Sequence, residues 1–230
     1  FQILFEKLVA VGERYGAVVP LYLMTSPATH DETLAYLAEH AYFGMHPDDV
    51  HVFCQGTMPA LDIASGRVLL EAPGRVFASP DGHGGMLAAL RRSGGLDDLR
   101  RRGLERLFYF QVDNPLVEVC DPVFIGYHLL SGSELSTQVV AKQSATERVG
   151  NVVSIDGQVQ IIEYSDLPES VAAQRTTSGE LKLWAGNIAV HIFAVPFLER
   201  TAADEHALPF HVARKLVPYV NESGCVITPS

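Results

Sequence analysis

The sequence has few cysteines, few basic residues and no long hydrophobic run. Its three cysteines lie far apart among 230 residues and without C-x-x-C spacing, so neither a disulfide framework nor a cysteine-rich zinc site is predicted. The apolar stretch over residues 18–24 is broken by Pro20 and is much shorter than the roughly 20 residues that a membrane span needs. These absences favour a globular protein of a reducing compartment, the cytoplasm, with no membrane partner.

Positive charge is also scarce. Seventeen Lys and Arg residues stand against 27 Asp and Glu residues, which gives a net charge of -10. A protein that grips nucleic acid or an anionic membrane needs a basic surface, so we expect no nucleic-acid partner. A small phosphorylated ligand stays possible, because backbone N–H groups and one divalent cation can offset phosphate charge locally.

What remains is an ordinary globular composition. Hydrophobic residues make up 47% of the chain and charged residues 19%, close to the average for soluble domains. A chain of this length can bury a sizeable core and allows one large domain, or one domain with a small satellite. The chain opens at Phe1, inside a helical pattern with no capping residue before it, and we expect it to be an internal piece of a longer protein.

Predicted strands and helices alternate along the first 130 residues. Strands are predicted at 17–24, 50–54 and 106–112, with a hairpin formed by 61–63 and 67–70. Thr29 and Glu32 form a capping-box pattern before one helix, and Asp121 followed by Pro122 is typical of the start of another. Further helices are expected from Met86 and over 96–102, whereas the Gly- and Pro-rich stretch 72–85 is expected to be a loop.

This alternation predicts an α/β fold with a mostly parallel mixed sheet flanked by helices. In such sheets ligands bind beyond the carboxyl ends of the strands, so the loops after Met24, Cys54 and Val112 are expected to border a site. From Asn151 the pattern changes. Two apolar runs, 152–155 and 159–162, flank Asp156-Gly157, which predicts a hairpin in an antiparallel subregion.

Two of these loops carry residues suited to a phosphorylated ligand. Asp113 follows an apolar strand, where an α/β sheet can present a carboxylate to a metal ion and phosphates, although aspartate is also common in plain turns. Residues 80–85 read PDGHGG before a helix. Glycines allow a ligand to approach the backbone, and a helix start favours an anion, but an ordinary surface loop has the same composition, and His83 could be a solvated loop residue.

Later residues suit sugar hydroxyl groups. Glu163, Tyr164 and Asn187 offer a carboxylate, a phenol and an amide, although each is also common in turns. The nine histidines lack metal-binding spacing, and no G-x-S-x-G nucleophile motif occurs. Hydrolase chemistry therefore has no support.

Several short motifs together resemble one family, the eukaryotic-type UDP-N-acetylhexosamine (UDP-N-acetylglucosamine) pyrophosphorylases. The stretches that carry the resemblance, in order, are PLYLMTS (20–26), FCQ (53–55), PDGHGG (80–85), VDN (112–114), DPVFIG (121–126), EYS (163–165), AGNI (185–188) and VPYV (217–220). The resemblance covers nearly the whole chain. It implies a Rossmann-like nucleotide-diphospho-sugar transferase core that joins UTP and a sugar 1-phosphate into a UDP-sugar and pyrophosphate, with Mg²⁺ (or Mn²⁺) neutralising charge.

The resemblance also implies a role for particular residues. Gln55 and Gly82 would hold the uracil, and Asp113 would be the catalytic residue that binds the metal ion between the phosphates. The sugar would be bound by His83, Gly150, Glu163, Tyr164 and Asn187. On this view residues 1–230 are the central uridylyltransferase domain, incomplete at both ends.

Two departures from the family pattern leave alternatives open. The family's Gly-rich loop, L-x-x-G-x-G-T-R ending in P-K, does not occur here, so we expect the chain by itself to bind weakly and catalyse little. His83 stands where the N-acetylhexosamine enzymes usually carry Asn, while relatives that use glucose 1-phosphate or varied sugars often have His. The alternatives are therefore a UDP-glucose or broad-specificity UDP-sugar pyrophosphorylase, and a non-catalytic UDP-sugar-binding module.

Overall fold

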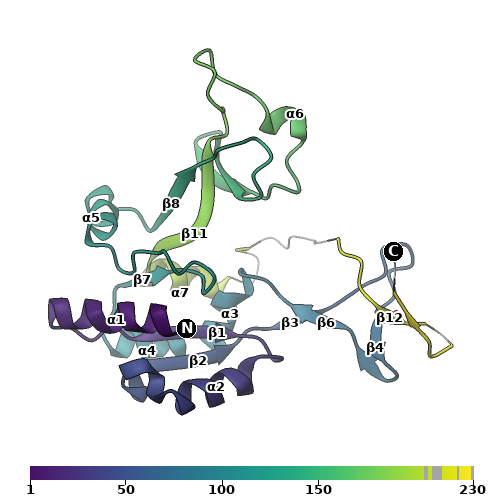
Figure 1. Cartoon of the computed structure of the whole chain (residues 1–230), viewed down its shortest axis with the longest axis horizontal. Coiled ribbons are helices and arrows are strands. Elements are labelled where there is room, and N and C mark those ends of the chain that lie inside the picture. Colours follow the sequence, from purple (N-terminus) through teal and green to yellow (C-terminus); the bar gives the residue numbers. More distant parts are fainter. Residues whose placement is uncertain (205–206, 209–213, 222, 229–230) are drawn as a thin grey trace. The chain divides into compact units, whose positions relative to one another are not determined.

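The computed structural model describes residues 1–204, 207–208, 214–221 and 223–228. The chain divides into two compact units (Figure 1). Unit 1 comprises residues 1–17 and 104–197, and unit 2 comprises residues 18–103 and 198–230. Each unit is discontinuous in sequence, because residues 18–103 of unit 2 separate the first helix from the rest of unit 1.

Unit 2 begins with a short parallel strand pair covered by helices. Its strands are β1 (Leu21–Thr25), β2 (Val50–Cys54), β3 (Thr57–Pro59), β4 (Leu70–Ala72), β5 (Arg75–Val76), β6 (Ala78–Pro80), β12 (Tyr219–Val220) and β13 (Val226–Ile227). Its helical segments are α2 (His30–Glu39), η1 (Ala41–Gly44), η2 (Pro47–Asp49), α3 (Gly85–Arg92) and α4 (Gly95–Arg101). The core is apolar, with Leu37, Phe53, Leu90 and Leu99 almost fully buried.

Unit 1 is built on an antiparallel sheet. Its strands are β7 (Arg106–Tyr109), β8 (Leu135–Ala141), β9 (Gly150–Ile155), β10 (Gln158–Ile162) and β11 (Ala185–Ala194). Its helices are α1 (Gln2–Tyr15), α5 (Pro122–Ser131) and α6 (Glu169–Ala172), and α7 (Val195–Ala203) crosses the boundary to unit 2. Strand β11 is central, because it pairs with β7, β8 and β9.

The predicted α/β class is confirmed, but the sheet is not mostly parallel. Among the described strands, β1 and β2 form the only parallel pair, and all other pairings are antiparallel. The strand that the sequence pattern placed beside them, β7, pairs instead with β11. Because β11 arrives from the hairpin region rather than through a helical crossover, it runs in the opposite direction to β7.

The structure confirms three local predictions, which concern a strand, a hairpin turn and a helix cap. Strand β2 has the predicted bounds. Asp156 and Gly157 both have positive φ, 51° and 80°, as a two-residue hairpin turn between β9 and β10 requires. The Asp121 carboxylate accepts hydrogen bonds from the backbone N–H groups of Val123 and Phe124, at 2.9 and 3.3 Å, and so caps helix α5.

Two other local predictions are wrong. Thr29 precedes α2, but its hydroxyl bonds to Ser26 rather than to the helix, so the capping box does not form. The stretch 72–85 is not a continuous loop, because β6 pairs with β3 through Met58 and Ser79. The first failure is local, since Ser26 competes for the Thr29 hydroxyl. The second arises because β3, a separate segment, supplies the partner of β6.

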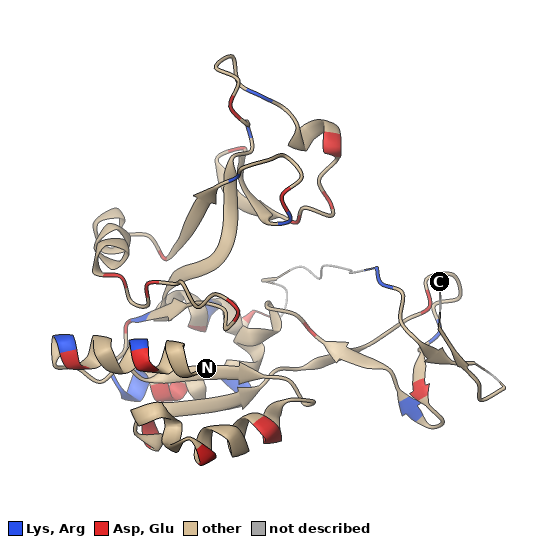
Figure 2. Cartoon of the chain, viewed as in Figure 1, with Lys and Arg blue, Asp and Glu red and all other residues tan. Residues whose placement is uncertain are grey.

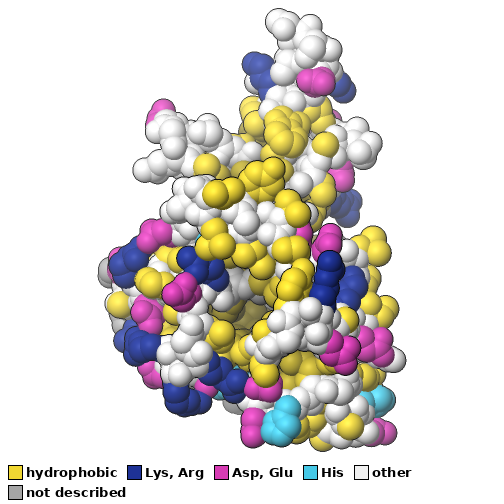
Figure 3. Space-filling view, turned by 90° about the vertical axis from the view of Figure 1, so that its left-hand side faces the viewer, with side chains coloured by type: hydrophobic (Ala, Val, Ile, Leu, Met, Phe, Trp, Pro, Cys, Tyr) yellow, Lys and Arg dark blue, Asp and Glu magenta, His cyan; other side chains and the backbone are white. Residues whose placement is uncertain are grey.

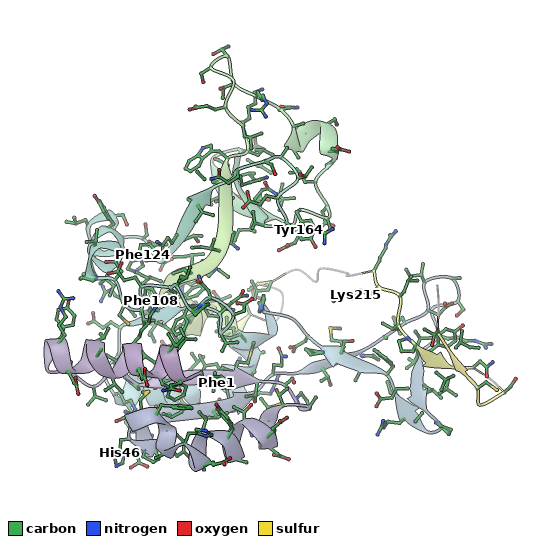
Figure 4. The ribbon with its side chains drawn as sticks, in the orientation of Figure 1. Phe1, His46, Phe108, Phe124, Tyr164 and Lys215 are labelled. Atoms are coloured by element: carbon green, nitrogen blue, oxygen red, sulfur yellow. The ribbon has the colours of Figure 1, made fainter. Side chains whose placement is uncertain are left out.

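Helix α5 packs one aromatic residue inward and leaves other apolar residues outside. Phe124 meets Phe108 of β7 edge to face, with ring centroids 6.2 Å apart (Figure 4). Tyr127 and Leu130 are 69% and 87% exposed. Figure 3 shows hydrophobic side chains at the surface of the face that it draws.

Along α1, basic and acidic residues are interleaved (Figure 2). No helix in the described part of the chain combines the length and apolar character needed to cross a membrane.

Candidate functional site

In unit 2, the parallel strand pair places Gln55 at its carboxyl edge. Thr25 and Cys54 are register partners at the ends of β1 and β2, and the backbone N–H of Gln55 donates to the carbonyl of Thr25 at 2.8 Å. The chain segments after Met24 and Cys54 therefore lie side by side, and that they border a ligand site stays a prediction. Gln55 is half-buried, so its amide can contact a ligand at this edge.

The PDGHGG segment approaches the same edge. The backbone N–H of Asp81 donates to the carbonyl of Gly56 at 3.1 Å, which joins this segment to the residue after Gln55. Gly82 has φ +78°, a left-handed conformation that favours glycine. Gly82 and His83 are exposed. Unit 2 thus brings Gln55 and the Gly82-His83 turn to one region.

The Asp81 carboxylate fills a space bounded by two glycines. A Cβ atom placed on Gly56 would lie 2.3 Å from Asp81 Oδ2, and one placed on Gly85 would lie 2.0 Å from Asp81 Oδ1. Asp81 Oδ1 is buried and, within the described residues, has no hydrogen-bond partner. Asp81 precedes α3, but its carboxylate lies against Gly85, the first residue of the helix, where the helix dipole favours negative charge. Sequence reasoning missed the packing of the Asp81 carboxylate between Gly56 and Gly85. The signal in the sequence was the position of Asp81 between Pro80 and the following glycines.

We expect Gly85→Ala to destabilise unit 2 by about 1–3 kcal/mol, since the added methyl group must displace the Asp81 carboxylate. In an Asp81→Ala background the same substitution should cost much less, because its clash partner is gone. Gly84→Ala is the control, since its Cβ would meet, among the described residues, only Leu208 Cδ1 at 3.8 Å. Urea unfolding of the four variants measures the coupling, and equal costs of Gly85→Ala in both backgrounds would contradict this account.

In unit 1, Asp113 lies in an exposed turn. Strand β7 ends at Tyr109, earlier than predicted, and the N–H of Asn114 donates to the carbonyl of Gln111 at 3.2 Å. Burial raises the pKa of Tyr109, a hydrogen bond with Gln111 lowers it, and the negative charge of Asp113 raises it further. Asp113 therefore stands as an accessible carboxylate beyond the end of a strand.

The donor set at Asp113 fits one kind of metal site. No group of three or more His, Cys, Asp or Glu residues in the described ranges could hold a metal ion, so a cation cage made by protein alone does not occur there. Mg²⁺ is commonly bound through one or two carboxylates together with substrate phosphates and water. A single exposed aspartate suits that mode, in which the substrate supplies most of the ligands.

The antiparallel sheet brings three predicted sugar-site residues together. Gly150 of β9 and Asn187 of β11 are register partners. A Cβ atom placed on Gly150 would lie 3.6 Å from Asn187 Cβ and 3.7 Å from Glu163 Oε1. The nearest atom to such a Cβ is Ile161 Cγ2, at 3.0 Å. Because Gly150 has no side chain, the backbone of β9 can therefore lie close to Ile161, Asn187 and Glu163.

The remaining groups of this region have distinct surroundings. Asn187 Oδ1 accepts the N–H of Ala189 at 3.0 Å, within a bulge where Ala189 has φ +54°, so the Asn187 side chain is held in place. Tyr164 follows Glu163 after β10 and is 47% exposed (Figure 4). Exposure of the phenol leaves it accessible to a ligand.

The predicted site residues therefore form two groups, one in each unit. Unit 2 contains Gln55, Gly82 and His83, and unit 1 contains Asp113, Gly150, Glu163, Tyr164 and Asn187. Sequence reasoning missed a buried pair beside the second group, Lys142 and Asn151, whose side chains are 2.6 Å apart. No local pattern could have identified it, because the two residues meet only through strand pairing.

Comparison with known proteins agrees with the motif order. The profile of the family described as UTP–glucose-1-phosphate uridylyltransferase matches residues 1–228. The chain belongs to this uridylyltransferase family. The resemblance inferred from the short motifs is thereby confirmed at the level of the family.

Individual relatives of this uridylyltransferase chain carry more specific names. It is 41% identical over 221 residues to UDP-N-acetylhexosamine pyrophosphorylase-like protein 1 of Homo sapiens, covering 95% of the chain and 43% of the relative. It is 37% identical over 236 residues to UDP-N-acetylglucosamine pyrophosphorylase of Saccharomyces cerevisiae, covering 100% and 49%.

A solved structure supports the fold of the uridylyltransferase chain. The UDP-N-acetylglucosamine pyrophosphorylase of Trypanosoma brucei, in complex with an inhibitor, is 30% identical, with a TM-score of 0.85 over 99% of this chain and 46% of that one. The chain thus spans about half the length of these relatives.

Proposed function

We propose that the protein carrying this chain transfers a uridylyl group, converting UTP and N-acetylglucosamine 1-phosphate into UDP-N-acetylglucosamine and pyrophosphate. The observation that carries the proposal is that Gly150, Glu163 and Asn187 lie close together at one end of strands β9, β10 and β11. Relatives of the chain have UDP-N-acetylglucosamine pyrophosphorylase in their names. A carboxylate and an amide close to each other suit a sugar bearing hydroxyl and acetamido groups.

In the proposed reaction, an oxygen of the sugar phosphate attacks the α-phosphorus of UTP in line. A bond forms between that oxygen and the α-phosphorus as the bond to the bridging oxygen breaks, and pyrophosphate leaves with the electron pair. No covalent intermediate with the protein is needed, so the protein acts by positioning the substrates and stabilising charge.

Each group of residues has a separate task in this proposal. Gln55 and Gly82 of unit 2 hold the uracil, and Gly150, Glu163, Tyr164 and Asn187 of unit 1 hold the sugar. Asp113 binds Mg²⁺, which when bound supplies neutralisation of phosphate charge. The three cysteines are free thiols, which is compatible with action in the cytoplasm.

A second function, a UDP-glucose or broad-specificity UDP-sugar pyrophosphorylase, is favoured by His83. Its imidazole stands in the Gly-rich turn where the N-acetylhexosamine enzymes usually have an amide. A third, a non-catalytic UDP-sugar-binding module, predicts binding without turnover.

Rates and binding separate these functions. For the full-length protein, we expect kcat/KM with N-acetylglucosamine 1-phosphate to exceed that with glucose 1-phosphate by at least about tenfold, the discrimination that one added polar contact can supply. Equal or reversed preference would support the broader enzyme. Calorimetric titration with UDP-N-acetylglucosamine and UDP-glucose, with and without Mg²⁺, provides the second readout. Binding with no turnover of either sugar would support the non-catalytic module.

A further inference from the structure

A lysine ammonium is buried inside the sheet of unit 1. Lys142 directly follows β8 and is 7% exposed. Its backbone N–H donates to the carbonyl of Trp184 at 2.8 Å, which continues the pairing of β8 with β11. Its Nζ donates to Asn151 Oδ1 at 2.6 Å. Burial of an ammonium group is costly unless the group is hydrogen-bonded. The Asn151 amide oxygen supplies such a bond, which an apolar residue at position 142 could not form.

The Asn151 side chain also forms a hydrogen bond to strand β10. Asn151 is 1% exposed. Its Nδ2 donates to the carbonyl of Val149 at 3.4 Å and to that of Ile162 at 3.5 Å. The Asn151 backbone is the register partner of Ile162 on β10 and of Gly186 on β11. The Lys142–Asn151 pair therefore ties the end of β8 to β9 and β10.

The tied strands are those that carry the predicted sugar-site residues. Gly150 immediately precedes Asn151, Glu163 immediately follows Ile162, and Asn187 immediately follows Gly186. Each of these three proposed sugar contacts is thus one residue away from a backbone that Asn151 engages. A shift of Asn151 would move all three contacts together.

The aliphatic part of the Lys142 side chain packs closely against Gly186. A Cβ atom placed on Gly186 would lie 3.3 Å from Lys142 Cγ and 3.0 Å from Val149 Cγ2. These distances are shorter than ordinary van der Waals contact, so a methyl group would press on the lysine stem and on the residue before Gly150. Gly186→Ala should therefore disturb the packing of Lys142 and Val149 against β11 without removing the Lys142 ammonium group.

We propose that Lys142 is a positioning residue for the sugar 1-phosphate, acting through Asn151 to hold Gly150, Glu163 and Asn187 in register. The inference rests on the proposed function, because it assigns the sugar subsite to these three residues. Lys142 is not a catalytic residue in this account, since its ammonium bonds to the protein rather than to substrate.

The test is steady-state kinetics of the full-length protein with UTP and N-acetylglucosamine 1-phosphate. For Lys142→Met we expect KM for the sugar phosphate to rise about tenfold, with KM for UTP within twofold and kcat within threefold of the starting protein. Lys142→Arg, which retains the cationic donor, should recover most of the loss. Asn151→Asp keeps an acceptor for Lys142 but removes the Nδ2 donors, so it should act like Lys142→Met.

A matched control is available in the same unit. Lys182 is exposed, and its Nζ lies 3.5 Å from the amide oxygen of Gln174, so Lys182→Met removes a lysine–amide contact away from the strand network. It should leave both KM values unchanged. Calorimetric binding of UDP-N-acetylglucosamine gives a readout independent of turnover, with weaker binding expected for Lys142→Met and unchanged binding for Lys182→Met.

Several outcomes would overturn the inference. One is a folded Lys142→Met protein with unchanged KM for the sugar phosphate. Another is a collapse of kcat or a rise in KM for UTP instead, which would indicate a direct phosphate contact. If Lys142→Met does not fold, as judged by circular dichroism, Asn151→Asp and Gly186→Ala decide by the same KM comparison. A starting protein that neither turns over nor binds these ligands would refute the proposed function itself, before any variant is compared.

Discussion

Replacing Asp113 by alanine is expected to lower kcat of the full-length protein by about 100-fold or more, since removal of a single charge-stabilising group commonly has an effect of this size. Asp113 is an exposed carboxylate beyond the end of β7. In the proposed reaction it would hold a divalent cation, which would neutralise phosphate charge. Its loss should therefore reduce turnover more than it reduces binding of the sugar.

Asp113→Asn refines this experiment. The amide keeps an oxygen ligand but lacks the negative charge, so we expect activity to remain low and to recover in part as the Mg²⁺ concentration is raised. The measurement is kcat as a function of Mg²⁺ concentration. Asp156→Asn is a matched control, because Asp156 also lies in a turn of unit 1 and its φ of 51° suits asparagine. An Asp113→Ala protein with activity within threefold of the control would refute the assigned role.

Replacing Asp98 by alanine is expected to have the largest effect on stability, a loss of about 3 kcal/mol. Asp98 lies on α4 and is 8% exposed. Its Oδ2 accepts the hydroxyl of Tyr22 at 2.6 Å and Nε of Arg102 at 3.0 Å, and its Oδ1 accepts a bond from Arg101. Alanine would leave the partly buried Tyr22 hydroxyl and Arg102 guanidinium without this shared partner.

The neighbouring Asp97 provides the control. It pairs with Arg100 at 3.3 Å, and both side chains are mostly exposed, so Asp97→Ala should cost well under 1 kcal/mol. Urea unfolding of the two variants tests the difference. Similar costs for the two substitutions would contradict the importance of the buried network.

The same network has a defined pH dependence. Burial tends to raise the pKa of Asp98, but the hydrogen bond from Tyr22 and the charges of Arg102 and Arg101 outweigh it, and the pKa lies below its usual value. The unfolded chain therefore binds this proton more readily than the folded one. The stabilisation is full above the unfolded value of about 3.9 and is lost as the pH falls through the folded pKa. The stability gap between the starting protein and Asp98→Ala should narrow over this acidic range.

The sequence by itself determined the elements whose cause is local. Strand β2 follows from an apolar β-branched run, the β9–β10 hairpin follows from Asp156-Gly157, and the start of α5 follows from Asp121-Pro122. In each case neighbouring residues supply the decisive interaction. The order of short motifs, which depends only on the chain, was likewise enough to indicate the family.

Only the tertiary structure decided which segments pair and which side chains meet. The antiparallel pairing of β11 with β7, β8 and β9 and the packing of Asp81 against Gly56 both depend on partners that are distant in the sequence. The buried Lys142–Asn151 contact is the clearest case. Polar groups in a core are stable only when they find partners, and the strand register, rather than the local sequence, determines those partners.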